Sequence, residues 1–479
     1  CLVGSEMCIR DSLTSFPLWS YNVNMIVEHY SVDQGLPNNT VNCTLKDRDG
    51  FIWFGTWYGL CCFDGVKFKT FNKQEHDSDV PPRKIQRIVE DKNGYIWVKT
   101  IDRKLYVFNK VTECFHAVYD DMKNYSENIQ VIKLQNTAEG DVLLLTKDKN
   151  LLLAGVDEKG QVTIKILFDS RDEINKHDYT LKHHVLCETE EYISWIGTDY
   201  KVSAVHKGAE LASRPADFIT SKINSGDKDS FTSFFEDGRK VWVGDRAGIF
   251  YSIDVRTGLV NRYVLSEIKG AISNLLVTPA GYVYLSVAGQ GTYEYDLAER
   301  RLQKINTEMN DAMVTHAFID QYDKIWFHEN EKALIYYDPL NHTAKRFPFT
   351  MFGKITTLYS EDAGERGLFF LSPAGEAWLF DREHAEMVYI NKLKQLSNDR
   401  ANQQFYHLML DNDGVLWLSS ADEGVYCMNF PKKQFNLLSL SPQSAGQENY
   451  TIGVRALFQS KSGDIWVGTR WQSVYRMDR

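Results

Sequence analysis

Variable loops follow a recurring strand-like motif of this chain, and their residue types suit the binding of a ligand. The loops read "WYG" from residue 57, "IDR" from 101, "DYK" from 199, "RAG" from 246, "GQG" from 289 and "NEK" from 330. Aromatic rings stack on sugar rings, while arginine, asparagine and glutamine form hydrogen bonds with hydroxyl or carboxylate groups. The candidate ligand contacts are Trp57, Tyr58, Arg103, Tyr200, Arg246, Gln290 and Asn330. The alternative is that these are ordinary exposed loop residues or contacts between two parts of the fold.

No arrangement of residues typical of catalysis or metal binding is found in the sequence. His183 and His184 are adjacent, but the surrounding "TLKHHVLCETE" is typical of an inner strand, which favours a structural role. The acidic turn "EDAGERG" at 361–367 lacks the spacing of a calcium loop, and no G-x-S-x-G occurs. We therefore predict no catalytic residue, no metal site and no cofactor. A polysaccharide lyase or glycosidase stays an alternative, because distant repeats could bring a pair of carboxylates together.

The element that positions these loops is a repeated hairpin. "DRDGFIWFGT" from Asp47, "DKNGYIWVKT" from Asp91 and "DNDGVLWLSS" from Asp411 each combine an Asp-x-x-Gly turn with an apolar strand. Because the aspartates recur with the turn, they indicate a role in folding rather than catalysis. The central aromatic residue or its equivalent falls at positions 53, 97, 144, 195, 242, 284, 326, 369, 417 and 466, at intervals of 42 to 51 residues. This period is typical of the four-stranded blades of a β-propeller.

The spacing of the repeats predicts an all-β fold of tandem β-propellers with four-stranded antiparallel blades. The first seven markers predict a seven-bladed ring over residues 25–350, and residues 351–479 would be the first three blades of a second, incomplete ring. A single ring of eight to ten blades is the rival arrangement. The strand at 25–32 resembles an outer strand that closes a ring, although the sequence does not say which ring. The tryptophans expected in blade cores are Trp53, Trp97, Trp242, Trp326, Trp417 and Trp466.

Composition narrows the classes of partner. The net charge of −10 argues against direct contact with nucleic acid, which needs a basic surface. No apolar run of roughly 18 residues occurs, so no membrane-spanning helix is predicted within these residues. The 8 cysteines show no C-x-x-C spacing and leave the disulfide state and the compartment open. Residues 1–12 resemble a translated sequencing adapter and are expected to be non-native, with residues 13–24 as a lead-in segment.

The first repeat resembles a known family. "HYSVDQGLPNNTVNCTLKDRDGFIWFGTWYGLCCFDGVKFKTFN", residues 29–72, is similar to the two-component regulator propeller repeat in its "GLPNNTV" entry, its "DGFIWFGT" core and its "GL-x-x-FDG" exit. The repeats around 97, 242, 417 and 466 fit this pattern well, and those around 144 and 369 fit it poorly.

The resemblance implies a function that the residues alone do not. Such repeats form the periplasmic sensor part of hybrid two-component systems, in which two seven-bladed propellers precede a β-sandwich, a membrane helix, a histidine kinase, a receiver and a DNA-binding domain. It implies an oligosaccharide as ligand, control of carbohydrate-utilisation genes, a homodimer in the complete receptor, and membrane attachment only through a C-terminal segment outside this chain. A propeller scaffold that binds proteins is the alternative.

Overall fold

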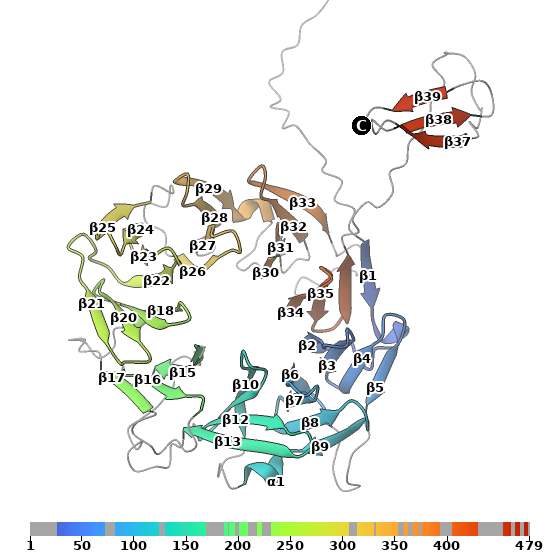
Figure 1. Cartoon of the computed structure of the whole chain (residues 1–479), viewed down its shortest axis with the longest axis horizontal. Coiled ribbons are helices and arrows are strands. Elements are labelled where there is room, and N and C mark those ends of the chain that lie inside the picture. The colour runs from blue at the N-terminus through green and yellow to red at the C-terminus, as the bar shows by residue number, and fades with distance from the viewer. Residues whose placement is uncertain are drawn as a thin grey trace, which may run out of the picture. The chain divides into compact units, whose positions relative to one another are not determined.

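Antiparallel sheets make up nearly all of the computed structural model (Figure 1). The structure describes residues 26–71, 82–123, 130–148, 150–168, 186–189, 191–196, 201–208, 218–222, 231–305, 314–329, 332–352, 359–362, 367–372, 376–392, 405–429, 454–460, 465–469 and 474–477. Within them are nine four-stranded sheets and one three-stranded sheet. In eight of the four-stranded sheets each strand pairs with the next one along the chain, which is the strand order of a propeller blade.

We number the blades in chain order. Blade 1 consists of β2 (Val41–Lys46), β3 (Ile52–Thr56), β4 (Gly59–Phe63) and β5 (Phe68–Phe71). Blade 2 consists of β6 (Ile85–Glu90), β7 (Ile96–Thr100), β8 (Leu105–Asn109) and β9 (Cys114–Ala117). Blade 3 consists of β10 (Val131–Asn136), β11 (Val142–Thr146), β12 (Leu151–Val156) and β13 (Val162–Phe168). Blade 4 consists of β14 (Leu186–Glu188), β15 (Tyr192–Ile196), β16 (Lys201–His206) and β17 (Phe218–Lys222). Blade 5 consists of β18 (Phe231–Glu236), β19 (Lys240–Asp245), β20 (Phe250–Asp254) and β21 (Val260–Tyr263).

The remaining blades follow the same order. Blade 6 consists of β22 (Ile272–Val277), β23 (Tyr282–Val287), β24 (Gly291–Asp296) and β25 (Arg301–Lys304). Blade 7 consists of β26 (Val314–Ile319), β27 (Ile325–Glu329), β28 (Ala333–Asp338) and β29 (Thr343–Pro348). Blade 8 consists of β30 (Tyr359–Asp362), β31 (Leu368–Leu371), β32 (Glu376–Asp381) and β33 (Glu386–Lys392). Blade 9 consists of β34 (Phe405–Leu410), β35 (Leu416–Ser420), β36 (Val425–Asn429) and β1 (Ile26–Tyr30). The helical segments described are α1 (Tyr119–Met122) and the 3-10 turns η1 (Val32–Gln34) and η3 (Phe349–Phe352).

An aspartate in the first turn organises the first hairpin of five blades. In blade 1, Asp47 Oδ1 accepts hydrogen bonds from the main-chain N–H groups of Asp49 (3.0 Å) and Phe51 (2.9 Å), which fixes the turn. Its other oxygen, Oδ2, accepts the indole N–H of Trp53 at 2.7 Å. The same indole-to-carboxylate bond joins Trp97 to Asp91, Trp242 to Asp237, Trp326 to Asp320 and Trp417 to Asp411. One carboxylate therefore closes the turn and also satisfies a polar group that the blade core buries.

Blades 3 and 6, which have no tryptophan at this position, use a hydroxyl instead. In blade 3, Thr137 Oγ1 accepts the N–H of Asp141 at 3.1 Å, and Leu144 replaces the tryptophan. In blade 6, Thr278 Oγ1 accepts the N–H of Tyr282 at 3.2 Å. A single hydroxyl oxygen is enough because these blades have only a turn to stabilise.

The nine blades form one closed ring. β1 pairs antiparallel with β36, with Ile26 opposite Asn429 and Tyr30 opposite Val425, so the first described strand completes the last blade (Figure 1). A hydrophobic cluster fills each of the nine junctions between neighbouring blades, including the junction of blade 9 with blade 1, where Trp417 packs with Phe54 and Phe63. β1 therefore pairs with the edge that β36 would otherwise expose at the seam.

The sequence-based domain boundaries are therefore wrong, while the propeller class is confirmed. The chain divides into compact units at Cys1–Phe430 and Pro431–Arg479, not at a boundary near residue 350, and blades 8 and 9 continue the first ring. We predicted a seven-bladed ring over 25–350 and three further blades over 351–479, but the structure has one nine-bladed ring and one separate sheet. The nine blades agree with the rival prediction of a single ring of eight to ten blades. The period of the repeat sets the size of a blade, whereas pairing between distant strands sets the number of blades.

The second unit holds one described sheet, made of β37 (Val454–Gln459), β38 (Ile465–Thr469) and β39 (Val474–Met477). Phe458 lies opposite Trp466, as Leu45 lies opposite Trp53 in blade 1, so the register is that of a blade. Trp466 is nevertheless 38% exposed, so the expectation that it lies in a blade core is wrong for this residue.

The other five tryptophans confirm the expectation, since each is at most 5% exposed. The cysteines whose side chains the structure describes are free thiols, namely Cys43, Cys61, Cys62, Cys114 and Cys427. No helix among the described residues is both long and apolar enough to cross a membrane.

The bond between Trp97 and Asp91 gives a first prediction. In a double-mutant cycle of Asp91→Ala and Trp97→Phe, followed by urea unfolding, we expect a coupling of about 1.5–3 kcal/mol, because the acceptor is charged and the donor is buried. The matched cycle of Thr278→Ala and Tyr284→Phe should give almost none, since the Tyr284 hydroxyl bonds Glu294 instead. Equal coupling in both cycles would show that the indole bond adds nothing specific.

Ring closure gives a second prediction. A chain of residues 26–429 should be a monomer with one cooperative thermal transition, because every blade junction is filled. A chain of residues 26–352 should lose that transition and associate, because the core around Trp326 and the edge of β1 lose their partners. Sedimentation velocity and a thermal melt measure both properties. A stable monomer of 26–352 would instead support a seven-bladed ring.

Candidate functional site

The two ends of the blades carry different loops. In an up-and-down blade the first and third turns lie at one end, which we call the turn face. The second turn and the connection to the next blade lie at the other end, which we call the loop face. Five of the residues predicted as ligand contacts are described, and these belong to second-turn loops and hence to the loop face: Trp57, Tyr58, Arg103, Arg246 and Gln290.

Main-chain hydrogen bonds tie neighbouring loops together on the loop face. The N–H of Lys84 donates to Trp57 O at 2.9 Å, and the N–H of Ile101 donates to Lys84 O at 2.9 Å. The seam of the ring is tied in the same way, because the N–H of Gly424 donates to Asn39 O at 2.9 Å. These main-chain hydrogen bonds therefore fix the backbone that carries the loop-face side chains of blades 9, 1 and 2.

The five predicted contacts that the structure describes lie in four different blades, 1, 2, 5 and 6. Trp57 and Tyr58 are 41% and 64% exposed, and the Lys84 ammonium lies 5.3 Å from the centre of a Trp57 ring. Arg103 is exposed and lies 3.5 Å from Gln130 Oε1.

Arg246 and Gln290 belong to blades 5 and 6, away from blades 1 and 2 (Figure 1). The Gln290 amide bonds the main chain of Glu267 and Lys269, at 3.3 and 2.8 Å. Tyr200 and Asn330, as well as His183 and His184, lie outside the described residues.

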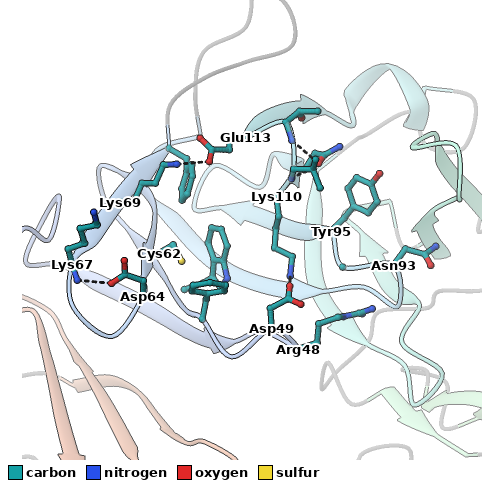
Figure 2. A pocket seen from close by; sticks show the side chains of 17 residues that line it. Arg48, Asp49, Cys62, Asp64, Lys67, Lys69, Asn93, Tyr95, Lys110 and Glu113 are labelled. Carbon is teal, nitrogen blue, oxygen red and sulfur yellow. Dashed lines mark hydrogen bonds and ion pairs between the residues drawn. The ribbon is translucent and has the colours of Figure 1, made fainter.

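The turn face contains a groove between blades 1 and 2, with a volume of about 850 Å³ (Figure 2). Its apolar wall includes Phe51, which is 43% exposed, and Phe71, whose ring stacks on buried Trp53 at 5.3 Å. Tyr95 of blade 2 lies on the opposite side. The volume is that of a small-ligand site, and the aromatic wall with polar groups around it is typical of one.

Several charged side chains around the groove already have hydrogen-bond or ion-pair partners. Lys69 Nζ lies 2.5 Å from Glu113 Oε1. Asp64 accepts the main-chain N–H groups of Lys67 and Val66, which lower the pKa of its carboxyl group. A ligand in this groove would therefore meet both hydrogen-bonding groups and charged groups that are already paired.

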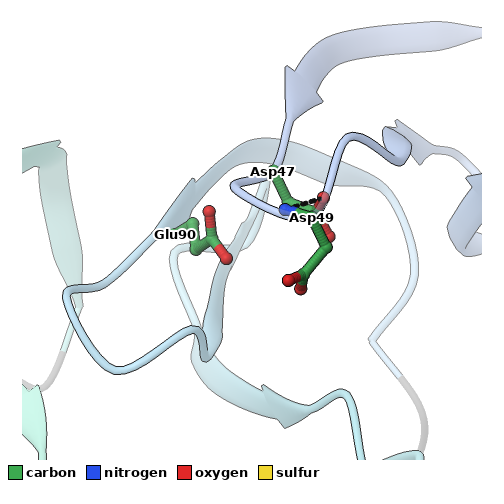
Figure 3. A group of neighbouring side chains, drawn as sticks. All are labelled: Asp47, Asp49 and Glu90. Carbon is green, nitrogen blue, oxygen red and sulfur yellow. Dashed lines mark hydrogen bonds between the residues drawn. The ribbon is translucent and has the colours of Figure 1, made fainter.

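Three carboxylates meet beside the groove, from Asp47, Asp49 and Glu90 (Figure 3). Lys110 Nζ lies among them, at 3.1 Å from Asp47, 2.6 Å from Asp49 and 2.8 Å from Glu90. Burial opposes the charge of Lys110, but hydrogen bonds to the three carboxylates outweigh it and raise its pKa. The ammonium group therefore occupies the place that a divalent cation would take, and the cluster joins blades 1 and 2 instead.

A second junction repeats this arrangement. Arg382 follows the third strand of blade 8 as Lys110 follows that of blade 2. Its guanidinium lies 2.5 Å from Asp320 of blade 7 and 2.7 Å from Asp362 at the end of the first strand of blade 8. The recurrence indicates that the Lys110 cluster is structural.

Comparison with known proteins identifies the repeat. Residues 35–58 match the model of the two component regulator propeller family. The chain carries a two-component regulator propeller repeat. The resemblance read from the sequence is confirmed. None of the curated proteins compared with the chain matches it in sequence.

Solved structures with low identity also resemble the chain. The extracellular domain of the hybrid two component system BT3049 of B. thetaiotaomicron is 17% identical, with a TM-score of 0.32, and the match covers 94% of this chain and 59% of that one. For BT4673 of the same organism the identity is 14%, the TM-score 0.36 and the coverage 90% and 68%. For virginiamycin B lyase of Staphylococcus aureus the identity is 11%, the TM-score 0.39 and the coverage 62% and 93%. TM-scores below 0.5 give these likenesses no weight for function.

One residue of blade 2 differs in type from the residues at the same position in other blades, and it is not among the residues predicted from the sequence. Blades 1 and 5 have Gly55 and Gly244 near the end of the second strand, where an added Cβ would clash with Cys43 Sγ and Ser233 Oγ. Blade 2 has Lys99 at this position, only 7% exposed. The signal was visible as "VKT" in place of "FGT" or "VGD".

A partly buried histidine, His407, lies on β34 of blade 9. His407 Nδ1 is buried without a hydrogen-bond partner among the described residues. Burial, with a smaller contribution from the charge of Arg87, lowers the pKa of His407 to about 4. The folded propeller therefore binds a proton here less readily than the unfolded chain does.

His407 gives a prediction for stability against pH. Its unfolded pKa is about 6.5, so protonation favours the unfolded chain, and stability should fall as the pH drops from about 6.5 to about 4. The loss from this group is at most on the order of 3 kcal/mol. His407→Asn should remove that part of the acid sensitivity in urea unfolding at pH 7.5 and 4.5. His384→Asn is the control, because Asp381 raises the pKa of His384. An unchanged acid loss in His407→Asn would contradict the assignment.

Proposed function

We propose that the chain is the ligand-sensing part of a membrane-bound hybrid two-component sensor, on the periplasmic side, and that it binds an oligosaccharide without turning it over. The match of residues 35–58 to the two component regulator propeller family carries the proposal. The signal would pass to a downstream kinase that controls carbohydrate-utilisation genes.

The groove between blades 1 and 2 is the site that best suits such a ligand. Exposed Phe51 and half-buried Tyr95 offer ring faces on which a sugar could stack. Asn93, Asn109 and Glu113 at its border could exchange hydrogen bonds with sugar hydroxyls. Because Arg48, Lys69 and Lys110 already form ion pairs, a neutral sugar would enter without leaving these charges unpaired. The aromatic pair Trp57 and Tyr58 on the loop face is the rival contact surface.

The two surfaces can be separated by matched variants at opposite ends of blade 1. In calorimetric titrations with a panel of neutral oligosaccharides, Phe51→Ala should weaken binding by about 1–2 kcal/mol, roughly 5- to 30-fold. Tyr58→Ala, which removes a more exposed ring, should leave the affinity unchanged. Thermal melting of both variants checks that the ring is intact.

Other outcomes would correct the proposal in distinct ways. Loss of affinity in Tyr58→Ala alone would move the site to the loop face and leave the sensing function standing. Steady release of shorter saccharides during incubation would overturn the non-catalytic role. If no member of the panel binds to the folded protein, the oligosaccharide as ligand is wrong.

A further inference from the structure

Two like charges face each other in the first hairpin of blade 2. Arg87 on β6 is the direct partner of Lys99 on β7, so both side chains project from the same face of the sheet. Like charges placed directly opposite one another in a sheet are destabilising. The presence of this pair in the sheet therefore needs an explanation other than the stability of the fold.

The hydrogen-bond partners of Lys99 among the described residues carry no negative charge. Its Nζ donates to Gln86 Oε1 at 2.9 Å and to the main-chain oxygen of Ile132 at 2.5 Å, both of them neutral acceptors. Among the residues that the structure describes, neither Arg87 nor Lys99 forms an ion pair with a carboxylate. An ammonium that is nine-tenths buried would ordinarily have a counter-charge.

The propeller does not need a cation here. In blade 1, Asn42 Nδ2 donates to Ile85 O of the next blade at 2.6 Å, and in blade 5, Thr232 Oγ1 donates to Ile272 O at 2.6 Å. Neutral side chains of the first strand thus join neighbouring blades. The residue at the position of Lys99 is glycine in blades 1 and 5 and serine in blades 6 and 9.

We propose that Arg87 and Lys99, with Arg103 of the adjoining loop, form a binding site for an oxyanion: the carboxylate, sulfate or phosphate group of a small ligand. β6 is among the strands nearest the centre of the ring (Figure 1), and both arginines are exposed. A planar guanidinium bonds two oxygens of such a group, and an ammonium acts as a point charge beside it. The site is separate from the groove on the turn face, so the inference goes beyond the proposed function.

The electrostatics of neighbouring groups agree with an uncompensated positive field. Burial, followed by the charges of Arg103 and Arg87, lowers the pKa of Lys99 to about 8. The charge of Arg87 also contributes to the low pKa of His407, from blade 9. A bound oxyanion would supply the missing counter-charge.

The test is titration of the whole chain at low salt and pH 7 with sodium sulfate, sodium phosphate, glucuronate and uncharged glucose. We expect saturable binding of at least one anion and none of glucose. Lys99→Ser, which installs the residue of blades 6 and 9, should weaken anion binding at least 10-fold. Lys104→Ser is the matched control, because Lys104 is an exposed lysine on the same blade beside Asp102, and it should change the affinity less than twofold.

Each arm decides a different point. Glucuronate binding would assign an acidic saccharide, and binding of sulfate or phosphate alone would assign an inorganic oxyanion. The thermal midpoint of Lys99→Ser should be equal to or above that of the parent, since like-charge repulsion is removed. No saturable binding by any anion, or equal losses in Lys99→Ser and Lys104→Ser, would overturn the proposal. Phe51→Ala should leave anion binding intact, so failure here is distinguishable from failure of the groove as a saccharide site.

Discussion

The bond between an aspartate carboxylate and a buried indole is the interaction on which the blades depend. A turn aspartate alone would fix only a local hairpin, and a buried tryptophan alone would carry an unsatisfied N–H. The Asp47 carboxylate satisfies the buried N–H of Trp53 while it also fixes the turn. Asp91 and Trp97 form the same bond in the next blade. The indole is thereby held at a fixed place in the blade, and the neighbouring blade packs on its ring. Trp53 contacts Phe108 of blade 2 at 5.5 Å between ring centres, so a local bond extends into a junction.

The junction between blades 1 and 2 shows how the two faces are built around that core. On the turn face, Lys110 joins carboxylates of both blades, and the groove lies beside it. On the loop face, the main chain of Lys84 receives and donates the bonds that connect consecutive loops. A ligand in the groove would therefore touch residues of two blades at once. Any change in the angle between those blades would change its contacts, which is the requirement for coupling a ligand to a conformation.

Most of the blade architecture could be predicted because it is local, while the ring and the groove could not. The Asp-x-x-Gly turn and the tryptophan strand lie within ten residues of each other, and their periodicity is visible in the sequence. The sequence predicts that the strand at 25–32 closes a ring, but its partner β36 comes from the opposite end of the unit, so no local pattern identifies that partner. Trp57 and Tyr58 were expected on the loop face and lie there, exposed. The groove is not among the predictions, because its residues, such as Phe51 and Lys110, come from recurring turns. The fold alone accounts for the recurrence of these turns, so they give no signal of a binding site.

Because the blades repeat, the residue at one position can be compared with its counterparts in other blades. This comparison separates two lysines of blade 2. Lys110 has three carboxylates around it, and Arg382 repeats its geometry six blades later, so folding explains it. Lys99 has two neutral acceptors, faces an arginine and occupies a position that is glycine or serine in blades 1, 5, 6 and 9. Both are lysines in the same blade, so neither residue type nor exposure separates a structural cation from a functional one. The charge balance around each lysine separates the two cases. A buried charge that serves only the fold is paired with an opposite charge, whereas a buried charge without such a pair indicates a ligand that supplies the counter-charge.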